Sequence, residues 1–235
     1  MRRGTDAAAT VALKASVDSR TEPRKQGKAP VPRPAKFTED QILDTALRLV
    51  ADGGPGAATI GAIADALPGP VGSIYHRFRS RDLLLARLWI RTVGRFQQEF
   101  LHALDDGDLD RAALGAALSV LAWARDHLDQ ARVLTLYRRR DLAARWPDEL
   151  GKQLIGLNRA VESALRDHAR RRYGRDDDDA VAQLTFAVVD VPYAAARRYL
   201  LTGEPPPLSL DDLVAATCAC ALAADVADPG RSGRT

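Results

Sequence analysis

Residues 59–82, TIGAIADALPGPVGSIYHRFRSRD, decide the fold of the N-terminal part of this chain. Thr59 is a favourable helix N-cap, and apolar residues at helical spacing follow it. The Pro-Gly-Pro run at 68–70 stops this pattern, because no helix crosses it. A second short helical pattern contains Ile74 and Phe78. Two short helices joined by a tight turn favour a helix-turn-helix, which projects its second helix into a DNA groove. An ordinary helical hairpin within a core is the alternative.

The sequence on both sides of this stretch favours the helix-turn-helix. Thr38 and Gln41 have the spacing of a capping box, so a helix should begin there. Gly53 and Gly54 should end it. Ser80 can cap a long helix whose apolar residues repeat at helical spacing up to residue 104. The expected order is helix, short helix, turn, short helix and long helix.

This order and its residues resemble the N-terminal domain of the tetracycline-repressor (TetR) family of bacterial transcription regulators. The matching positions are Phe37, Thr38, Ile42, Ala46, Leu49, Gly53, Thr59, Ile63, Ala64, Gly72, Ile74, Tyr75, Phe78, Arg81, Leu83 and Leu84. The chain departs from the family in the turn, where Pro68 and Gly69 replace a glycine and an apolar residue. Because Leu67 precedes a proline, the first short helix should end near Ala66.

The resemblance implies an all-α protein with an N-terminal three-helix DNA-binding domain and a C-terminal helical domain for ligand binding and dimerisation. Hydrophobic residues make up 46% of the chain, enough for a packed core, and aromatic residues only 6%, which favours helices. We expect a basic, disordered arm over residues 1–35 and a helix-turn-helix domain over 36–82. A regulatory and dimerisation domain over 83–226 and a flexible tail over 227–235 should follow.

The net charge of +3 hides an uneven distribution. Residues 1–36 contain nine basic and three acidic side chains, together with many prolines and glycines. This composition favours disorder. A basic arm beside a helix-turn-helix can contact phosphates or enter a minor groove. A solvated leader that contacts nothing is an equally good interpretation.

The contacts with double-stranded DNA can be assigned from positions along the second short helix. Three residues at its start or on its exposed side are candidate base readers: Val71, Ser73 and His76. Four others should grip phosphate: Thr59, Tyr75, Arg77 and Arg81. For Tyr75, a place in the core is the alternative.

The remaining sequence predicts helices over about 110–127, 129–144, 147–172, 177–201 and 210–225. Pro192 should kink the fourth of them. The resemblance implies that the last two helices form a homodimer by packing against their copies as a four-helix bundle. The candidate contacts are Ala187, Val188, Val191 and Ala195 in the first helix and Leu213, Val214, Thr217 and Ala221 in the second.

Two polar residues in apolar surroundings suggest a ligand site. Asn158 shares an apolar helical stripe, and Asp190 interrupts an apolar run. A buried amide or carboxylate needs a hydrogen-bond partner, which is either internal, such as Arg197, or a ligand. Aromatic residues on the helices that line the family's pocket would complete the site: Phe96, Phe100, Trp123, Tyr137 and Phe186. The effector should then be mainly apolar, with a hydrogen-bonding or cationic group.

Other classes of function find little support in the sequence. The sequence contains no run of about 18 apolar residues, so it predicts no membrane span. An apolar leader that would predict secretion is also missing from its N-terminus. Cys218 and Cys220 are expected to act as small apolar residues with free thiols, as is usual in a reducing cytoplasm. The aspartates at 176–179 lack the pattern of a calcium loop and suit a helix start. We therefore expect a cytoplasmic protein with no enzymatic activity, cofactor, metal or membrane partner.

The expected function is that of a DNA-binding transcription regulator, a repressor that a small-molecule effector releases from its operator. By the resemblance, the effector tilts the long helix over 81–104 and moves the two DNA-binding heads out of register. The alternative is a ligand-independent architectural DNA-binding dimer. Its footprint would be sequence-blind, with a steep dependence on salt.

Overall fold

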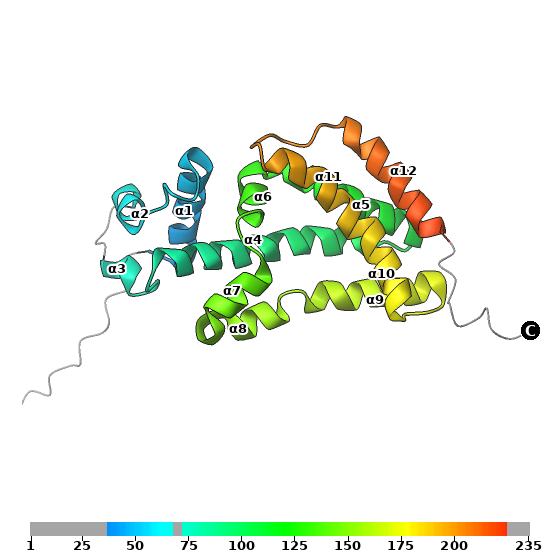
Figure 1. Ribbon diagram of the computed structural model, residues 1–235, viewed down its shortest axis with the longest axis horizontal. Coiled ribbons are helices and arrows are strands. Elements are labelled where there is room, and N and C mark those ends of the chain that lie inside the picture. The colour runs from blue at the N-terminus through cyan, green and yellow to red at the C-terminus, as the bar shows by residue number, and fades with distance from the viewer. Residues whose placement is uncertain (1–36, 68–71, 225–235) are drawn as a thin grey trace, which may run out of the picture. The chain divides into compact units, whose positions relative to one another are not determined.

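The computed structural model describes residues 37–67 and 72–224, which lie in helices or in the connections between them (Figure 1). The prediction of an all-α fold is confirmed. The expected basic arm, the Pro-Gly-Pro turn, Val71 and the expected C-terminal tail lie outside the described residues. The division into functional domains stays a prediction.

The described elements follow one another along the chain as twelve α-helices and one π-helical turn. They are α1 (Glu39–Gly53), α2 (Ile60–Ala66), α3 (Gly72–Tyr75), α4 (Arg81–Leu104), α5 (Leu109–Asp126), α6 (Leu128–Leu134), α7 (Arg139–Arg145), α8 (Pro147–Gly156), α9 (Arg159–Tyr173), α10 (Asp178–Thr185), η1 (Phe186–Asp190), α11 (Val191–Leu200) and α12 (Ser209–Ala223).

Side-chain caps fix the starts of the three longer helices at the N-terminal end. Thr38 and Gln41 form the predicted capping box at α1. The hydroxyl of Thr59 accepts a hydrogen bond from the backbone N–H of Ala62 at 3.0 Å. At α4, the Ser80 hydroxyl accepts one from Leu83 at 3.1 Å. All three predicted helix starts are therefore confirmed.

The first helix of the helix-turn-helix ends where the sequence indicates, and the second ends earlier. Helix α2 stops at Ala66, and Leu67 is extended, with φ −110° and ψ 118°, as expected before a proline. Helix α3 ends earlier than its apolar pattern suggests, at Tyr75. The amide of Phe78 still donates to the carbonyl of Ile74 at 2.9 Å, so one further turn continues beyond the helix.

The predicted single helix over 129–144 is wrong, because the chain breaks between α6 and α7. Helix α6 ends in a tighter turn, in which each amide donates to the carbonyl three residues before it. The amide of Thr135 donates to Arg132, and that of Leu136 to Val133. The carbonyl of Leu134 accepts a hydrogen bond from the indole of Trp89 on α4 at 3.2 Å. A tertiary contact thus replaces a bond that would have continued the helix.

The predicted helix over 147–172 is also divided, into α8 and α9. Asn158 occupies the N-cap position of α9, and its side-chain oxygen accepts a hydrogen bond from Gln97 on α4 at 3.0 Å. Gly156 ends α8, and the hydrogen bond from a residue 61 positions away holds the side chain of Asn158 at the break.

The predicted helix over 177–201 contains a π-helical turn, η1. Pro192 has no N–H to donate to Val188, and its ring crowds that carbonyl. The amide of Val191 instead reaches back five residues to Phe186, which accommodates one extra residue before α11. The predicted disturbance at Pro192 therefore takes the form of a change in helical register.

Two hydrophobic clusters form the core of the described chain. The head cluster joins α1–α4 with residues of α6, α7 and α8, and includes Phe78 and Leu84, both fully buried. The regulatory cluster joins the second half of α4 with α5, α6 and α9–α12. Helix α4 belongs to both clusters and runs lengthwise through the arrangement in Figure 1. No helix in the described ranges is long and apolar enough to cross a membrane.

Candidate functional site

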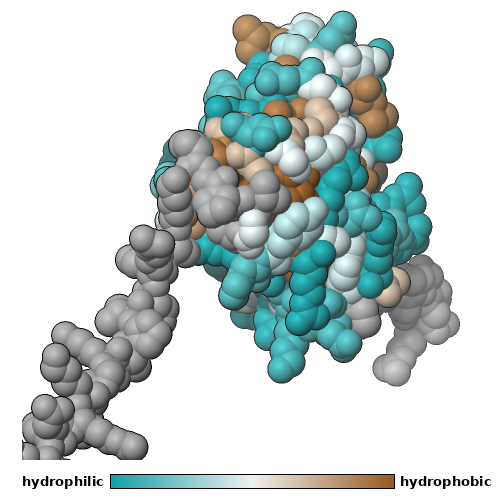
Figure 2. Space-filling model, turned by 90° about the vertical axis from the view of Figure 1, so that its left-hand side faces the viewer, coloured by the Kyte–Doolittle hydropathy of each residue, from teal (hydrophilic) through white to brown (hydrophobic). Residues whose placement is uncertain are grey.

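The DNA-reading face is set by which sides of α2 and α3 the head cluster buries. Ile63 and Ala64 of α2 and Ile74 of α3 face inward. The opposite sides carry Thr59 and His76, which are exposed. Hydrophilic and weakly polar residues cover most of the coloured surface at this end, which Figure 2 shows face on.

Tyr75 is 54% exposed, so the alternative that it belongs to the core is wrong. Its hydroxyl can donate to a phosphate oxygen, the role predicted for it. Thr59 uses its hydroxyl oxygen as a cap for α2, and its proton stays available for an acceptor. Ser73 lies in α3, but its side chain is outside the described part of the structure.

The two arginines predicted to grip phosphate also bind the backbone of the head. Arg77 donates to the carbonyl of Phe37, just before α1. Arg81 donates to the carbonyls of Ala58, at 3.1 Å, and Pro55. These hydrogen bonds orient both guanidinium groups and link the end of the helix-turn-helix to the segments around α1 and α2. Their role at phosphate remains a prediction.

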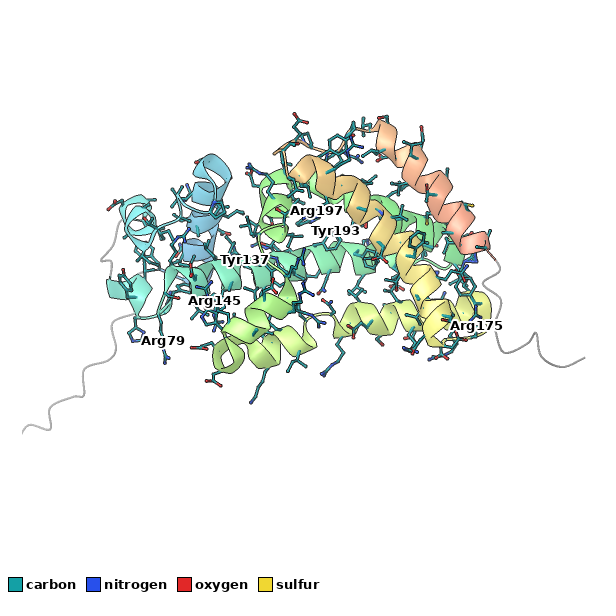
Figure 3. All side chains as sticks on the ribbon, viewed as in Figure 1. Arg79, Tyr137, Arg145, Arg175, Tyr193 and Arg197 are labelled. Atoms are coloured by element: carbon teal, nitrogen blue, oxygen red, sulfur yellow. The ribbon has the colours of Figure 1, made fainter. Side chains whose placement is uncertain are left out.

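Sequence analysis missed Arg79, which lies between these two arginines. Its side chain is exposed at the end of the molecule that carries α3 (Figure 3). No ion pair or hydrogen bond to another described residue holds its guanidinium. A free cation beside Tyr75 and Arg77 is well placed for a phosphate, and only its position in the loop after α3 could have indicated this.

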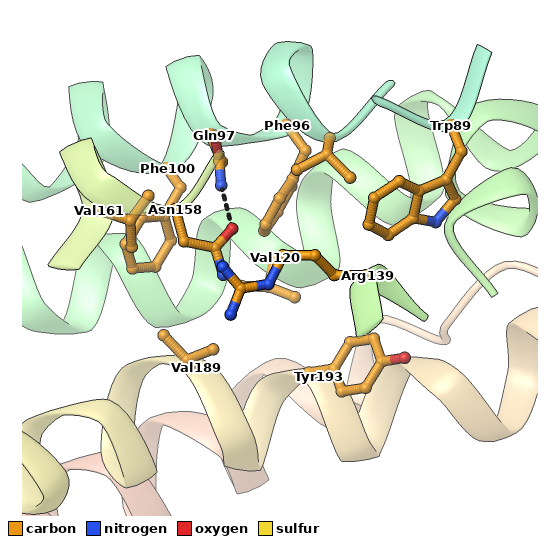
Figure 4. A pocket seen from close by; sticks show the side chains of 11 residues that line it. Trp89, Phe96, Gln97, Phe100, Val120, Arg139, Asn158, Val161, Val189 and Tyr193 are labelled. Carbon is orange, nitrogen blue, oxygen red and sulfur yellow. Dashed lines mark hydrogen bonds between the residues drawn. The ribbon is translucent and has the colours of Figure 1, made fainter. Parts of the chain in front are cut away.

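A second candidate site is a cavity of about 320 Å³ between α4, α5, α7, α9 and the η1–α11 segment (Figure 4). An adjoining lobe of about 300 Å³ shares the side chains of Trp89, Val93, Phe96, Val120 and Tyr193. Phe96 packs edge-on against Trp123, with ring centroids 5.3 Å apart. Most of the wall is apolar, as in typical small-molecule sites.

Five of the seven predicted ligand residues line these two lobes. Phe96, Phe100 and Asn158 line the first, and Phe96, Trp123 and Tyr137 line the second. Burial raises the pKa of the Tyr137 phenol, and the negative charge of Asp82 adds to this effect. The tyrosine therefore remains a neutral hydrogen-bonding group at the edge of the cavity.

The other two predicted ligand residues, Phe186 and Asp190, lie outside the cavity. Phe186 is 52% exposed, and Asp190 is also exposed. Both belong to η1, where the π-helical turn rotates side chains away from the direction that a regular helix would give them. The carboxylate that suggested a cationic effector is therefore absent from the cavity wall.

Asn158 faces the cavity and has an internal hydrogen-bond partner, while its predicted role in ligand binding stays a prediction. Its amide lines the cavity and accepts a hydrogen bond from Gln97, which sequence analysis did not identify. Arg139, Trp89 and Tyr193 were missed as well. On α4, Trp89 lies two turns before Phe96 and Gln97 lies one turn before Phe100, and that helical spacing could have revealed them.

The candidate dimer contacts divide into buried and exposed groups. Ala187, Val188 and Val214 are buried within the protomer, so their assignment to a surface is wrong. The run around 187 is apolar on all sides, and its sequence does not distinguish an inner from an outer face. Leu213 is 63% exposed, and Thr217 is exposed on the same helix. Val191, Ala195 and Ala221 are partly exposed.

Metal and thiol chemistry receive no support from the described ranges. No group of three or more histidine, cysteine or acidic side chains there could hold a metal ion. Cys218 is buried and Cys220 exposed, and both are free. Asp177 caps α10 through the amide of Ala180, which lowers the pKa of its carboxyl together with Arg175. The aspartate run is thus a helix start, as expected.

The fold and the exposed face of α2 and α3 define a helix-turn-helix DNA-binding regulator. Residues 42–88 match the family model described as bacterial regulatory proteins, tetR family. The helix-turn-helix region of the chain is therefore that of a TetR-family transcription regulator, a family that is not enzymatic. No curated protein matches the chain.

Solved structures share the fold over most of the chain. The fatty acid degradation regulator FadR from Bacillus halodurans is 17% identical, with a TM-score of 0.58, and the match covers 80% of this chain and 100% of that one. The ketosteroid transcriptional regulator KstR2 of Mycobacterium tuberculosis is 19% identical, with a TM-score of 0.55, and the match covers 81% of this chain and 97% of that one. The TetR family regulator PfmR from Thermus thermophilus is 19% identical, with a TM-score of 0.57, and the match covers 82% of this chain and 99% of that one.

Proposed function

We propose that this regulator is a homodimeric repressor that leaves its operator when a small molecule fills the cavity beside α4. The observation that carries the proposal is that one helix serves both sites. Helix α4 lines the cavity with Trp89, Val93, Phe96, Gln97 and Phe100. The same helix holds the head through the residues between Leu83 and Ile90 in the head cluster.

A charged contact strengthens the link between α4 and the head. The Arg91 side chain is only 14% exposed, and its guanidinium lies 3.1 Å from Asp40 and 2.7 Å from Asp44 of α1. Because α1 packs against the helix-turn-helix, a displacement of α4 at the cavity carries α1 with it. At the start of α4, Asp82 also pairs with Arg145 of α7, the short helix that begins at the cavity with Arg139.

The dimer would use the exposed apolar side chains of η1, α11 and α12. Phe186 and Leu213 are large, apolar and largely uncovered in the protomer. Exposed apolar residues that gather on neighbouring helices are typical of protein–protein contacts. A dimer is also the natural partner of successive major grooves, because each protomer then reads one half-site.

A ligand moves an equilibrium only when it prefers one of two conformations. A large side chain built into the cavity should have the same preference as a ligand, so the proposal can be tested without knowing the effector. We expect Val93→Trp to remain dimeric and helical but to bind the operator at least about tenfold more weakly, an energy of about 1.4 kcal/mol. The operator would first be selected from random duplexes with the wild-type protein.

Gln98→Trp is the matched control, because residue 98 is an exposed position of the same helix. It adds the same side chain without filling the cavity and should bind the operator normally. Equal operator affinity of Val93→Trp and wild type would contradict coupling between cavity and head. A wild-type footprint without sequence preference and with a steep salt slope would instead support an architectural DNA-binding protein.

A further inference from the structure

From the charges around the cavity, and on the basis of the proposed function, we infer that the effector is an amphipathic carboxylate: one anionic head on an apolar body, with the head bound by Arg139. This specifies the chemical class that the sequence left open between hydrogen-bonding and cationic groups.

The wall of the cavity is basic as well as apolar. Arg139 lines the first lobe and Arg138 the adjoining lobe. Neither lobe is lined by an aspartate or a glutamate. Asp190, the carboxylate that would have favoured a cation, is exposed outside both lobes. Any charged group that enters therefore meets positive charge without an internal counter-ion.

Arg139 is available to bind a ligand. Its side chain is exposed where the cavity opens, and no described carboxylate forms an ion pair with it. The next residue differs, because Arg140 is paired with Asp141 at 3.5 Å. A guanidinium stays charged at all relevant pH values and presents a planar set of donors that fits a carboxylate with two hydrogen bonds.

Asn158 brings a second donor to the same cavity wall, and its amide overlaps this guanidinium in the view of Figure 4. The oxygen of the Asn158 amide is occupied by Gln97, at 3.0 Å, which leaves the NH₂ group of Asn158 for a ligand. Donors from α7 and from the start of α9 thus line the same cavity as the apolar side chains of Phe96, Trp89 and Val120. An anionic head needs such donors, and its apolar body needs the remainder of this wall.

The dimensions suit a small effector with its charge at the opening. A volume of about 320 Å³ is at the lower end of the range of about 300–1,000 Å³ for small-molecule pockets. The aromatic rings can cover an alkyl chain or a phenyl ring, and the head can keep part of its hydration at the mouth. This arrangement avoids the cost of burying a charge completely.

The test is calorimetric titration of the full-length protein with four probes of similar size, each below its micelle concentration. Decanoate and 4-phenylbutyrate carry the carboxylate on an alkyl and an aromatic body. Decan-1-ol and decyltrimethylammonium replace it with a neutral and a cationic head. We expect at least one carboxylate to bind about tenfold or more tightly than the alcohol, since charged hydrogen bonds are the stronger ones. The ammonium probe should bind most weakly.

Arg139→Gln should weaken carboxylate binding about tenfold or more and leave decan-1-ol binding unchanged. Arg140→Gln is the matched control, because it removes a neighbouring arginine that does not line the cavity. Unchanged decan-1-ol binding and thermal unfolding would show that the Arg139 variant keeps its fold. Loss through Arg140 as well would point to general surface charge and overturn the assignment.

The inference fails if decan-1-ol or the ammonium probe binds as tightly as the carboxylates, if no probe binds, or if Arg139→Gln has no effect. Such results would leave the proposed function standing as long as Val93→Trp weakens operator binding. Conversely, carboxylate binding that leaves operator affinity unchanged would support the ligand class and contradict the repressor mechanism. The two hypotheses can therefore fail separately.

Discussion

The head cluster and the regulatory cluster are built from different side chains. Alanine supplies four of the 21 buried residues in the head cluster but nine of the 21 in the regulatory cluster. In the head, large aliphatic residues and Phe78 fill the space between short, capped helices. In the regulatory part, alanines on α5 allow close approach of helices, whereas the aromatic residues Phe96 and Trp123 stand around a cavity.

Under the proposed function, this difference separates a part that must keep one shape from a part that must bind a ligand. A fully packed head loses contacts with any displacement, so it moves as a unit. A cavity wall has contacts missing already, and a ligand can supply them. Helix α4 connects the two kinds of packing, and the following experiments test how sharply they differ.

Phe78→Ala should have the largest effect on stability. The ring is fully buried in the head cluster, so its removal should cost about 3–5 kcal/mol of unfolding free energy. Phe96→Ala, at the cavity, should cost about 1–2 kcal/mol, because part of its ring already faces open space. Chemical denaturation of both variants measures the difference. Equal losses would show that the two clusters are packed alike.

Leu213→Glu should disrupt the proposed dimer. A glutamate there would be desolvated in the interface without a partner, a cost of about 2 kcal/mol or more per protomer. Analytical ultracentrifugation should show monomers, and operator binding should be lost. Ile155→Glu is the control, since Ile155 is 70% exposed on α8. A dimer that survives Leu213→Glu would place the interface elsewhere.

Arg79→Ala and Arg81→Ala distinguish a contribution to DNA binding from a contribution to the stability of the head. Arg79 is held by no described partner, so its removal should lower the salt slope of DNA binding by about one and leave the melting temperature unchanged. Arg81→Ala should also lower the unfolding free energy by about 1–2 kcal/mol, because the carbonyls of Ala58 and Pro55 lose their donor. If both variants were equally stable, the backbone contacts of Arg81 would contribute nothing.

The smallest expected effect concerns pH and only the regulatory part. Burial lowers the pKa of His168, and the positive charges of Arg171 and Arg172 act in the same direction. Unfolding frees the imidazole to take up a proton near its ordinary pKa of about 6.5, so stability falls as pH drops through that value. His168→Gln should make the unfolding free energy flatter between about pH 7.5 and 5.5. His102→Gln, at an exposed position, should retain the wild-type slope.

The head could be predicted well because its signals are local. Capping residues act within three positions, and a proline restricts the residue before it. Thr38, Thr59, Ser80 and Leu67 therefore behave in the structure as the sequence indicates. Local rules could not predict that Arg77 and Arg81 donate hydrogen bonds to distant backbone carbonyls. They therefore could not single out Arg79, which has no such bond to a described residue.

The regulatory part was predicted less well because its breaks come from contacts between distant residues. The indole of Trp89 bonds to Leu134 at the end of α6, and Gln97 bonds to Asn158 where α9 begins. Neither partner can be recognised from the sequence beside the break. The apolar run before Pro192 could not show which side faces inward. Predictions that assumed regular helical spacing in this run were therefore wrong: Val188 is buried instead of lying at a dimer surface, and Phe186 and Asp190 are exposed instead of lining the cavity.

The extra residue within η1 makes this point of the chain tolerant of a change in length. Deleting one residue between 186 and 190 would allow α10 and α11 to join as one regular helix. The residues after the deletion would keep about their present orientation, because the π-helical turn already takes up the one residue that would otherwise turn them by about 100°. Tyr193 would still line the cavity, and Ala196 and Leu200 would stay in the core. In related sequences, a gap of one position here would therefore mark the loss of the π-helical turn, with the same inward residues in α11, rather than a shorter loop.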